Sequence, residues 1–206
     1  MAQGLMRTAK VGAITKEVEQ MRISIDLFKT KYGGIPGDLD KAATFFGSYL
    51  TYNGNGDFTL CTDEVGQFWE HMYLAGLVEQ EMTGITSTVD CSTPNWLMTL
   101  GGRAYYSAAA GAKPNSASGA GYFPTNGTPY GQTDTRLKLR LAKFYSSGGS
   151  IYSNNVGNSL FKPSFAFLLD TKVDDGDPDS GDVYAGRGND NPGTTCTTRE
   201  SWGGTY

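Results

Sequence analysis

Apolar residues in the first 32 positions are spaced alternately by three and four, which is the pattern of one face of an α-helix. Ile23 and Leu27 add apolar positions near the C-terminal end and predict deeper burial of the last turns. Gly33 and Gly34 suit a C-terminal cap and Pro36 follows, so the helix should end at about residue 32. This apolar face consists of Val11, Ile14, Val18, Met21, Ile25, Phe28 and Tyr32, and the first six are predicted to pack or assemble.

Shorter elements are expected after this helix. Helical spacing predicts a short turn within 38–47, a second helix at about 63–78 and a third over 163–176. Thr62 or Asp63 can cap the second helix at its N-terminus.

Strand signals come later in the chain. The segment "RLKLRLAKF" (136–144) alternates apolar and basic residues, as a half-exposed antiparallel strand does. A late strand is expected at "GDVYAG" (181–186). Residues 107–135 are mostly Ala, Ser, Gly, Asn and Thr, which predicts a long loop.

Composition favours a single extracellular domain. The 206 residues fit one domain with an appended helix, which divides the chain into a helix at 1–34 and a head at 35–206. With 28 Gly, 12 Tyr and only 18% charged residues, the head should be loop-rich and Tyr-rich. No run of eighteen apolar residues occurs, so the chain as given does not span a membrane.

Charge is distributed unevenly along the chain. Residues 1–32 carry six Lys or Arg against three acids, whereas residues 170–206 carry eight acids against three bases. A basic helix and an acidic C-terminal region could pair head to tail between copies. Two ordinary solvated surfaces would give the same counts.

Signals for catalysis and for nucleic-acid binding are weak. His71 is the one histidine, and it lies inside the second predicted helix without a partner motif, which favours a packing role. The sequence contains no phosphate-binding glycine motif and no nucleophile motif. The net charge of −4 argues against nucleic acid. We therefore expect no enzyme and no nucleic-acid partner.

Two stretches have oxygen ligands at spacings that suit calcium. In "NGNGDFTLCTDE", four residues occupy positions 1, 3, 5 and 12 of an EF-hand-like loop. The alternative is a plain turn held by Asx hydrogen bonds. This first candidate set is Asn53, Asn55, Asp57 and Glu64.

The second candidate is the acidic stretch "DDGDPDSGD", where five carboxylates repel one another unless water or a cation neutralises them. A solvated acidic turn is the alternative. The candidate ligands are Asp174, Asp175, Asp177, Asp179 and Asp182.

Three cysteines allow one disulfide in an oxidising compartment and leave one thiol. Cys61 with Cys91 would join the two ends of the second predicted helix and is preferred. Cys91 with Cys196 is the alternative.

Four motifs together resemble the bacterial type IV pilin and type II secretion pseudopilin superfamily. They are the "KYGGIPGD" junction at 31–38, the "NGNGD" loop at 53–57, the "E...FW.HM..AGLV" helix at 64–78 and the "DTKVDDGDPDSG" segment at 170–181. They span about 150 residues in the expected order.

The resemblance implies a pilin-like α+β fold, in which a long N-terminal helix packs on an antiparallel sheet, with further short helices and long loops. It implies that residues 1–32 correspond to the amphipathic second half of the family's helix. The apolar first half and the prepilin peptidase site are not in this sequence, so contact with the membrane would depend on a missing N-terminal segment. Some heads of the superfamily hold calcium in a late loop.

Two functions follow as expectations. The first is a pilin or pseudopilin that polymerises with itself and with other pilus or secretion-system subunits, in a filament assembled from the bacterial inner membrane and exposed at the cell surface. The second is a secreted, calcium-stabilised binding or adhesion module, with a recognition loop near Tyr105, Tyr106, Tyr122 and Tyr130.

Overall fold

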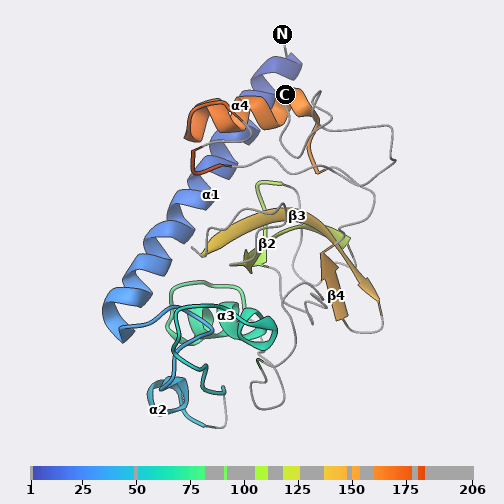
Figure 1. The fold of residues 1–206 in the computed structure, drawn as a ribbon. Coiled ribbons are helices and arrows are strands. Elements are labelled where there is room, and N and C mark those ends of the chain that lie inside the picture. The colour runs from blue at the N-terminus through green and yellow to red at the C-terminus, as the bar shows by residue number, and fades with distance from the viewer. Residues whose placement is uncertain are drawn as a thin grey trace.

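In the residues that the computed structural model describes, one long helix lies along a head made of a sheet and three shorter helices (Figure 1). The helices are α1 (Ala2–Tyr32), α2 (Ala42–Phe46), α3 (Thr62–Leu74) and α4 (Pro163–Val173). The strands are β1 (Tyr105–Tyr106), β2 (Ser118–Thr125), β3 (Lys138–Ser147) and β4 (Ser150–Ser153). The structure describes residues 2–48, 51–81, 91, 105–110, 118–125, 137–147, 150–153, 160–177 and 181–183.

The long helix α1 ends where the sequence predicts. Gly33 adopts a positive φ of 75°, and its amide donates to the carbonyl of Lys29 at 2.9 Å, which closes the last turn. Pro36 and Gly37 then turn the chain into the head. The last turns of α1 therefore lie beside α3, while its N-terminal half lies beside α4 (Figure 1).

The sheet is an antiparallel meander in the order β1-β2-β3-β4. Strands β2 and β3 pair over eight residues, with Tyr122 opposite Leu141. The prediction of a loop throughout 107–135 is wrong, because β2 lies within that range. Its small residues give no strand pattern of their own, and the strand is instead held by ladders to β1 and β3.

The core lies where α1 and α3 meet one face of the sheet. Leu137, Leu139 and Leu141 pack against it, as the alternation at 136–144 predicts. The Nε1 of Trp69 donates to the carbonyl of Tyr122 at 3.1 Å and joins α3 to β2. The buried members of this cluster are Met21, Ile25, Phe28, Ile35, Leu39, Ala42, Leu60, Val65, Phe68, Trp69, Met72 and Tyr122.

Two helix ends and one expected strand differ from the sequence-based predictions. Helix α3 ends at Leu74 rather than near 78, because Gly76 adopts a φ of 71° and the chain turns there. Helix α4 ends at Val173 rather than 176. The first half of the expected strand 181–186 is not a strand, and its second half lies outside the described residues. Among the described helices, none is long and apolar enough to cross a membrane.

Candidate functional site

The inner face of α1 is used within the molecule. Of the six residues predicted for packing or assembly, five are buried and Val18 is partly buried. Those near the N-terminus form a small cluster with Phe165 of α4, and those near the C-terminus join the main core. The five buried residues are Val11, Ile14, Met21, Ile25 and Phe28.

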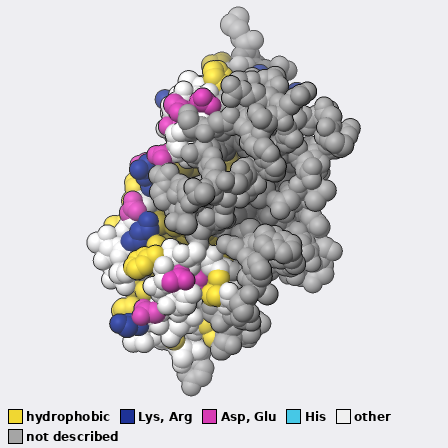
Figure 2. All heavy atoms as spheres, viewed as in Figure 1, with side chains coloured by type: hydrophobic (Ala, Val, Ile, Leu, Met, Phe, Trp, Pro, Cys, Tyr) yellow, Lys and Arg dark blue, Asp and Glu magenta, His cyan; other side chains and the backbone are white. Residues whose placement is uncertain are grey.

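The opposite face of α1 exposes apolar side chains. Ile23 and Leu27 are 52% and 53% exposed, so the prediction that they deepen the buried seam is wrong. Each lies two positions from a buried residue, which on a helix turns it to the far side, and the two are one turn apart. Leu5 is also exposed, at 73%. Along the edge formed by α1, hydrophobic and charged side chains alternate at the surface (Figure 2).

Glu17 joins α1 to the sheet by hydrogen bonds that sequence reasoning missed. Its Oε2 accepts from the hydroxyls of Ser107 at 2.6 Å and Tyr122 at 3.1 Å, and its Oε1 accepts from the amide of Ala109 at 2.8 Å. Tyr122 is therefore buried and engaged, which removes it from the recognition loop expected of a binding module. The side chains of Tyr105 and Tyr106, and Tyr130 as a whole, lie outside the described part.

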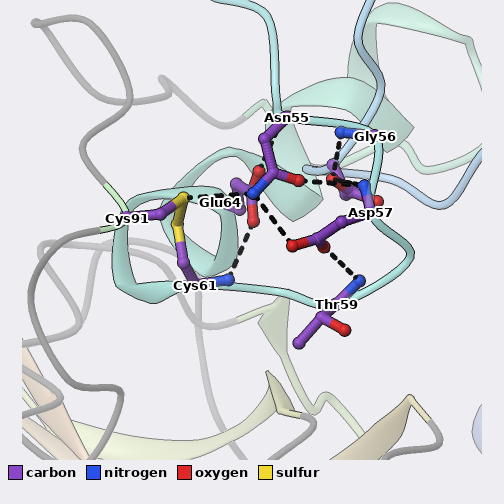
Figure 3. Close-up of a disulfide and its surroundings, with 8 residues drawn as sticks. Asn55, Gly56, Asp57, Thr59, Cys61, Glu64 and Cys91 are labelled. Atoms are coloured by element: carbon purple, nitrogen blue, oxygen red, sulfur yellow. Dashed lines mark hydrogen bonds between the residues drawn. A yellow bond between two sulfur atoms is a disulfide. The ribbon is translucent and has the colours of Figure 1, made fainter.

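The "NGNGD" loop is held by carboxylates that accept backbone amides (Figure 3). Asp38 accepts from the amides of Gly56 at 2.7 Å, Asp57 at 3.2 Å and Phe58 at 2.7 Å. Glu64 accepts from Asn55 and from Cys61, both at 2.8 Å, and so caps α3 from inside its first turn. Asp38 was missed as the centre of this loop because it lies 18 residues before Gly56 in sequence.

Burial sets the ionisation of these two acids. Burial raises the pKa of Glu64 to about 7. The hydrogen bonds from the amides of Cys61 and Asn55 act in the opposite direction and lower this pKa. Burial also raises the pKa of Asp38, again against its amide donors. The nearby charges of Asp38 and Asp57 add to the rise at Glu64. Near neutral pH, Glu64 is therefore partly protonated.

The first predicted calcium set does not converge on one point. Asn53 is directed at α2, where its Oδ1 accepts from the amide of Ala43 at 2.9 Å. The side chains of Asn55 and Asp57 hydrogen-bond to each other at 3.0 Å, and both oxygens of Glu64 accept amides. The observed geometry is that of an Asx-stabilised turn, and calcium at this loop stays a prediction.

His71 is a structural residue at the junction between α1 and the head. Its Nδ1 accepts from the amide of Gly37 at 2.8 Å, so the proton sits on Nε2, which donates to Thr51 at 3.0 Å. Burial lowers its pKa to about 4. Thr51 also contacts Gln67 at 3.2 Å and Glu70 at 3.1 Å, so a buried polar network joins α3 to the start of the head.

The structure contains the preferred disulfide. Cys61 and Cys91 are bonded with a Cα–Cα distance of 5.2 Å, and Cys61 is the N-terminal cap of α3 (Figure 3). The bond therefore holds the start of α3 to a segment 30 residues later. Cys196 lies outside the described residues.

The acidic end of α4 brings three carboxylates together. Oxygens of Asp170, Asp174 and Asp175 lie within 4.8 Å of one another, and Asp170 is buried. The sequence pattern pointed to Asp174 and Asp175 but missed Asp170, whose signal was its helical spacing of four from Asp174.

Most of the remaining acids of that stretch lie apart from this group. Asp177 and Asp182 are exposed at the surface, and Asp179 lies outside the described part. Asp174 accepts the amides of Asp182 and Val183, and Asp170 accepts that of Gly176. Carboxylate oxygens in such a group are suitable ligands for a hard cation.

Comparison of the chain with protein-family models, with curated proteins and with solved structures finds no match.

Proposed function

We propose that this chain is a structural subunit, a pilin or pseudopilin, of a type IV pilus-like filament that assembles along the N-terminal helix. The observation that carries the proposal is that α1 has apolar side chains on two faces, of which the head covers one. Its inner face packs on the head, and its outer face leaves Leu5, Ile23 and Leu27 exposed. Burying each such side chain is worth about 1.5–3 kcal/mol. A second copy that covers the outer face would gain this energy.

The disulfide supports a place outside the cytoplasm. A bond between Cys61 and Cys91 persists in oxidising compartments such as the bacterial periplasm or cell surface. The proposal assigns no catalytic role, since both ring nitrogens of His71 are engaged in structural hydrogen bonds.

The test is the native reading frame upstream of the codon for Met1. We expect a prepilin cleavage site followed by about twenty apolar residues, enough for one membrane-spanning helix. A stop codon in frame directly before Met1 would refute the filament proposal. If the segment is present, electron microscopy of the producing cells should show filaments that disappear when the gene is deleted.

A second candidate is a secreted, calcium-stabilised binding module. The grouping of Asp170, Asp174 and Asp175 favours it. Calcium at about 100 times its Kd would add about 2.7 kcal/mol of stability. For a chain of this size, that is a rise of roughly 5–11 °C in melting temperature.

The measurement is a melting scan with calcium and with chelator, on the wild type and on D174N. We expect the shift in the wild type and its loss in D174N. Equal midpoints for the wild type in both conditions would remove calcium from this site.

A further inference from the structure

Charge and exposure on α1 define an outer face, formed by Ile23, Leu27, Lys16 and Lys31. The two apolar residues are half exposed, and both lysines are exposed. Lys31 lies one turn after Leu27, and Lys16 lies two turns before Ile23, so all four residues share one side of the helix. Lys31 also contacts the ring of its neighbour Tyr32 at 5.0 Å.

The acids of α1 neutralise this face only in part. Glu17 is turned to the sheet, where it accepts three hydrogen bonds. Asp26 pairs with Lys29 at 3.6 Å. Glu19 is exposed three positions after Lys16 and four before Ile23, so it also lies on this side, and the outer face keeps an excess of one positive charge from Lys16 and Lys31.

A second surface has the opposite charge and a matching apolar pair. On α4, Phe167 and Leu168 are 44% and 43% exposed. The segment after α4 folds back beside Phe167, since a Cβ at Gly176 would lie 3.5 Å from its ring. Asp177 and Asp182 of that segment are exposed, and Lys172, one turn after Leu168, is exposed as well, so the two aspartates outnumber the one lysine. We call Phe167, Leu168, Asp177 and Asp182 the α4 surface.

The two surfaces cannot meet within one molecule. Helix α4 packs on the inner side of α1, where Phe165 contacts Val11 and Ile14. Ile23 lies nine residues beyond Ile14, which is about 13 Å along the helix, and points to the other side. Any contact between the outer face and the α4 surface therefore joins two copies.

We infer that the α4 surface of one copy docks on the outer face of α1 in a second copy, with Phe167 and Leu168 against Ile23 and Leu27. The lysines of the outer face then lie opposite the aspartates of the α4 surface. The two surfaces differ, so the contact is heterologous, and such contacts repeat into an open chain unless a rotation closes a ring. This inference rests on the proposed filament function and names the surfaces that the filament would use.

The test is a charge swap on the full chain, followed by sedimentation velocity. One variant is K16E/K31E and the other is D177K/D182K. At about 10 mM salt, where the Debye length is about 30 Å, we expect the wild type to self-associate as its concentration approaches about 1 mM. Each variant alone should raise the Kd by about tenfold or more, because attraction becomes repulsion at both charges.

An equimolar mixture of the two variants should restore association, since each variant keeps one native surface and the two reversed surfaces also match in sign. The control E79K/E81K changes the net charge as D177K/D182K does, at exposed positions outside both surfaces, and should behave as the wild type. If a reversal fails to fold, K16Q/K31Q and D177N/D182N should each weaken association without repulsion.

Three results would overturn the inference: a wild type that stays monomeric, variants that associate as well as the wild type, or a mixture that stays apart. None of them decides the filament proposal, which the upstream reading frame tests separately. The filament proposal would then require contacts through other surfaces.

Discussion

Replacing Glu17 by alanine is expected to lower the free energy of unfolding by about 3 kcal/mol. The carboxylate accepts from the hydroxyls of Ser107 and Tyr122 and from the amide of Ala109, at 2.6–3.1 Å. Alanine removes the acceptor of all three donors at once. Ser107 and Tyr122 are buried, so water cannot fully replace the lost bonds.

The magnitude follows from the number of donors. A hydrogen bond contributes about 1 kcal/mol, and more where one partner is charged. Glu17 is half-buried, so we take about 1 kcal/mol for each of three bonds rather than the upper value. For a chain of this size, the loss is a fall of roughly 6–12 °C in melting temperature. Glu17→Gln keeps one acceptor oxygen and should lose about 1 kcal/mol.

The assay is urea unfolding followed by circular dichroism, with Glu19→Ala as the matched control. Glu19 lies two positions away on the exposed side of the same helix, so its replacement should change stability by less than about 0.5 kcal/mol. If E17A and E19A unfold at the same urea concentration, Glu17 does not hold α1 to the sheet and the reasoning fails.

Three further predictions concern the junction and the disulfide. Relative to ordinary values of 6.5 and 4.5, burial lowers the pKa of His71 to about 4 and raises that of Glu64 to about 7. His71 therefore lowers the free energy of unfolding as the pH falls from about 6.5 to about 4. Glu64 lowers it as the pH rises from about 4.5 to about 7. His71→Gln removes the contribution of the histidine, so only that of Glu64 remains, and the free energy of unfolding should fall with rising pH by up to about 1.4 kcal/mol per unit. A pH profile equal to that of the wild type, measured by urea unfolding at several pH values, would contradict this. Gly37→Ala should cost about 3 kcal/mol or more, because φ is +90° and the new Cβ would lie 2.3 Å from the carbonyl oxygen of Glu64, whereas Gly33→Ala, with φ +75° and open space, should cost about 1 kcal/mol. Equal melting temperatures for the two alanine variants would refute it. Reducing the disulfide, which closes a loop of 30 residues, should lower stability by about 3–4 kcal/mol in urea unfolding; no change on adding reductant would count against its structural role.

Local signals predicted the backbone elements best. The end of α1 could be predicted because Gly33 and Pro36 leave the helix no continuation. Strand β3 could be predicted because its leucines alternate toward the core. Strand β2 could not be predicted, since residues such as Gly119 and Gly121 have weak strand preference and depend on their neighbours in the sheet.

Long-range contacts account for the errors at the candidate sites. Ile23 is apolar like its buried neighbours, and only the placement of the head decides which side of α1 is covered. Asp38 and Glu17 are ordinary acids in the sequence, and their roles depend on partners 18 to 105 residues away. A spacing rule for ligands near one another in sequence could not identify such acceptors.

The packing of α1 on α4 has a consequence for biosynthesis. Val11 and Ile14 find their partner Phe165 only after about 150 more residues have been made, which takes roughly 8–30 s at usual elongation rates. During that interval the N-terminal half of the apolar face of α1 lacks the cover of α4. Until α4 is complete, this apolar face is a surface that a chaperone or a lipid membrane can bind.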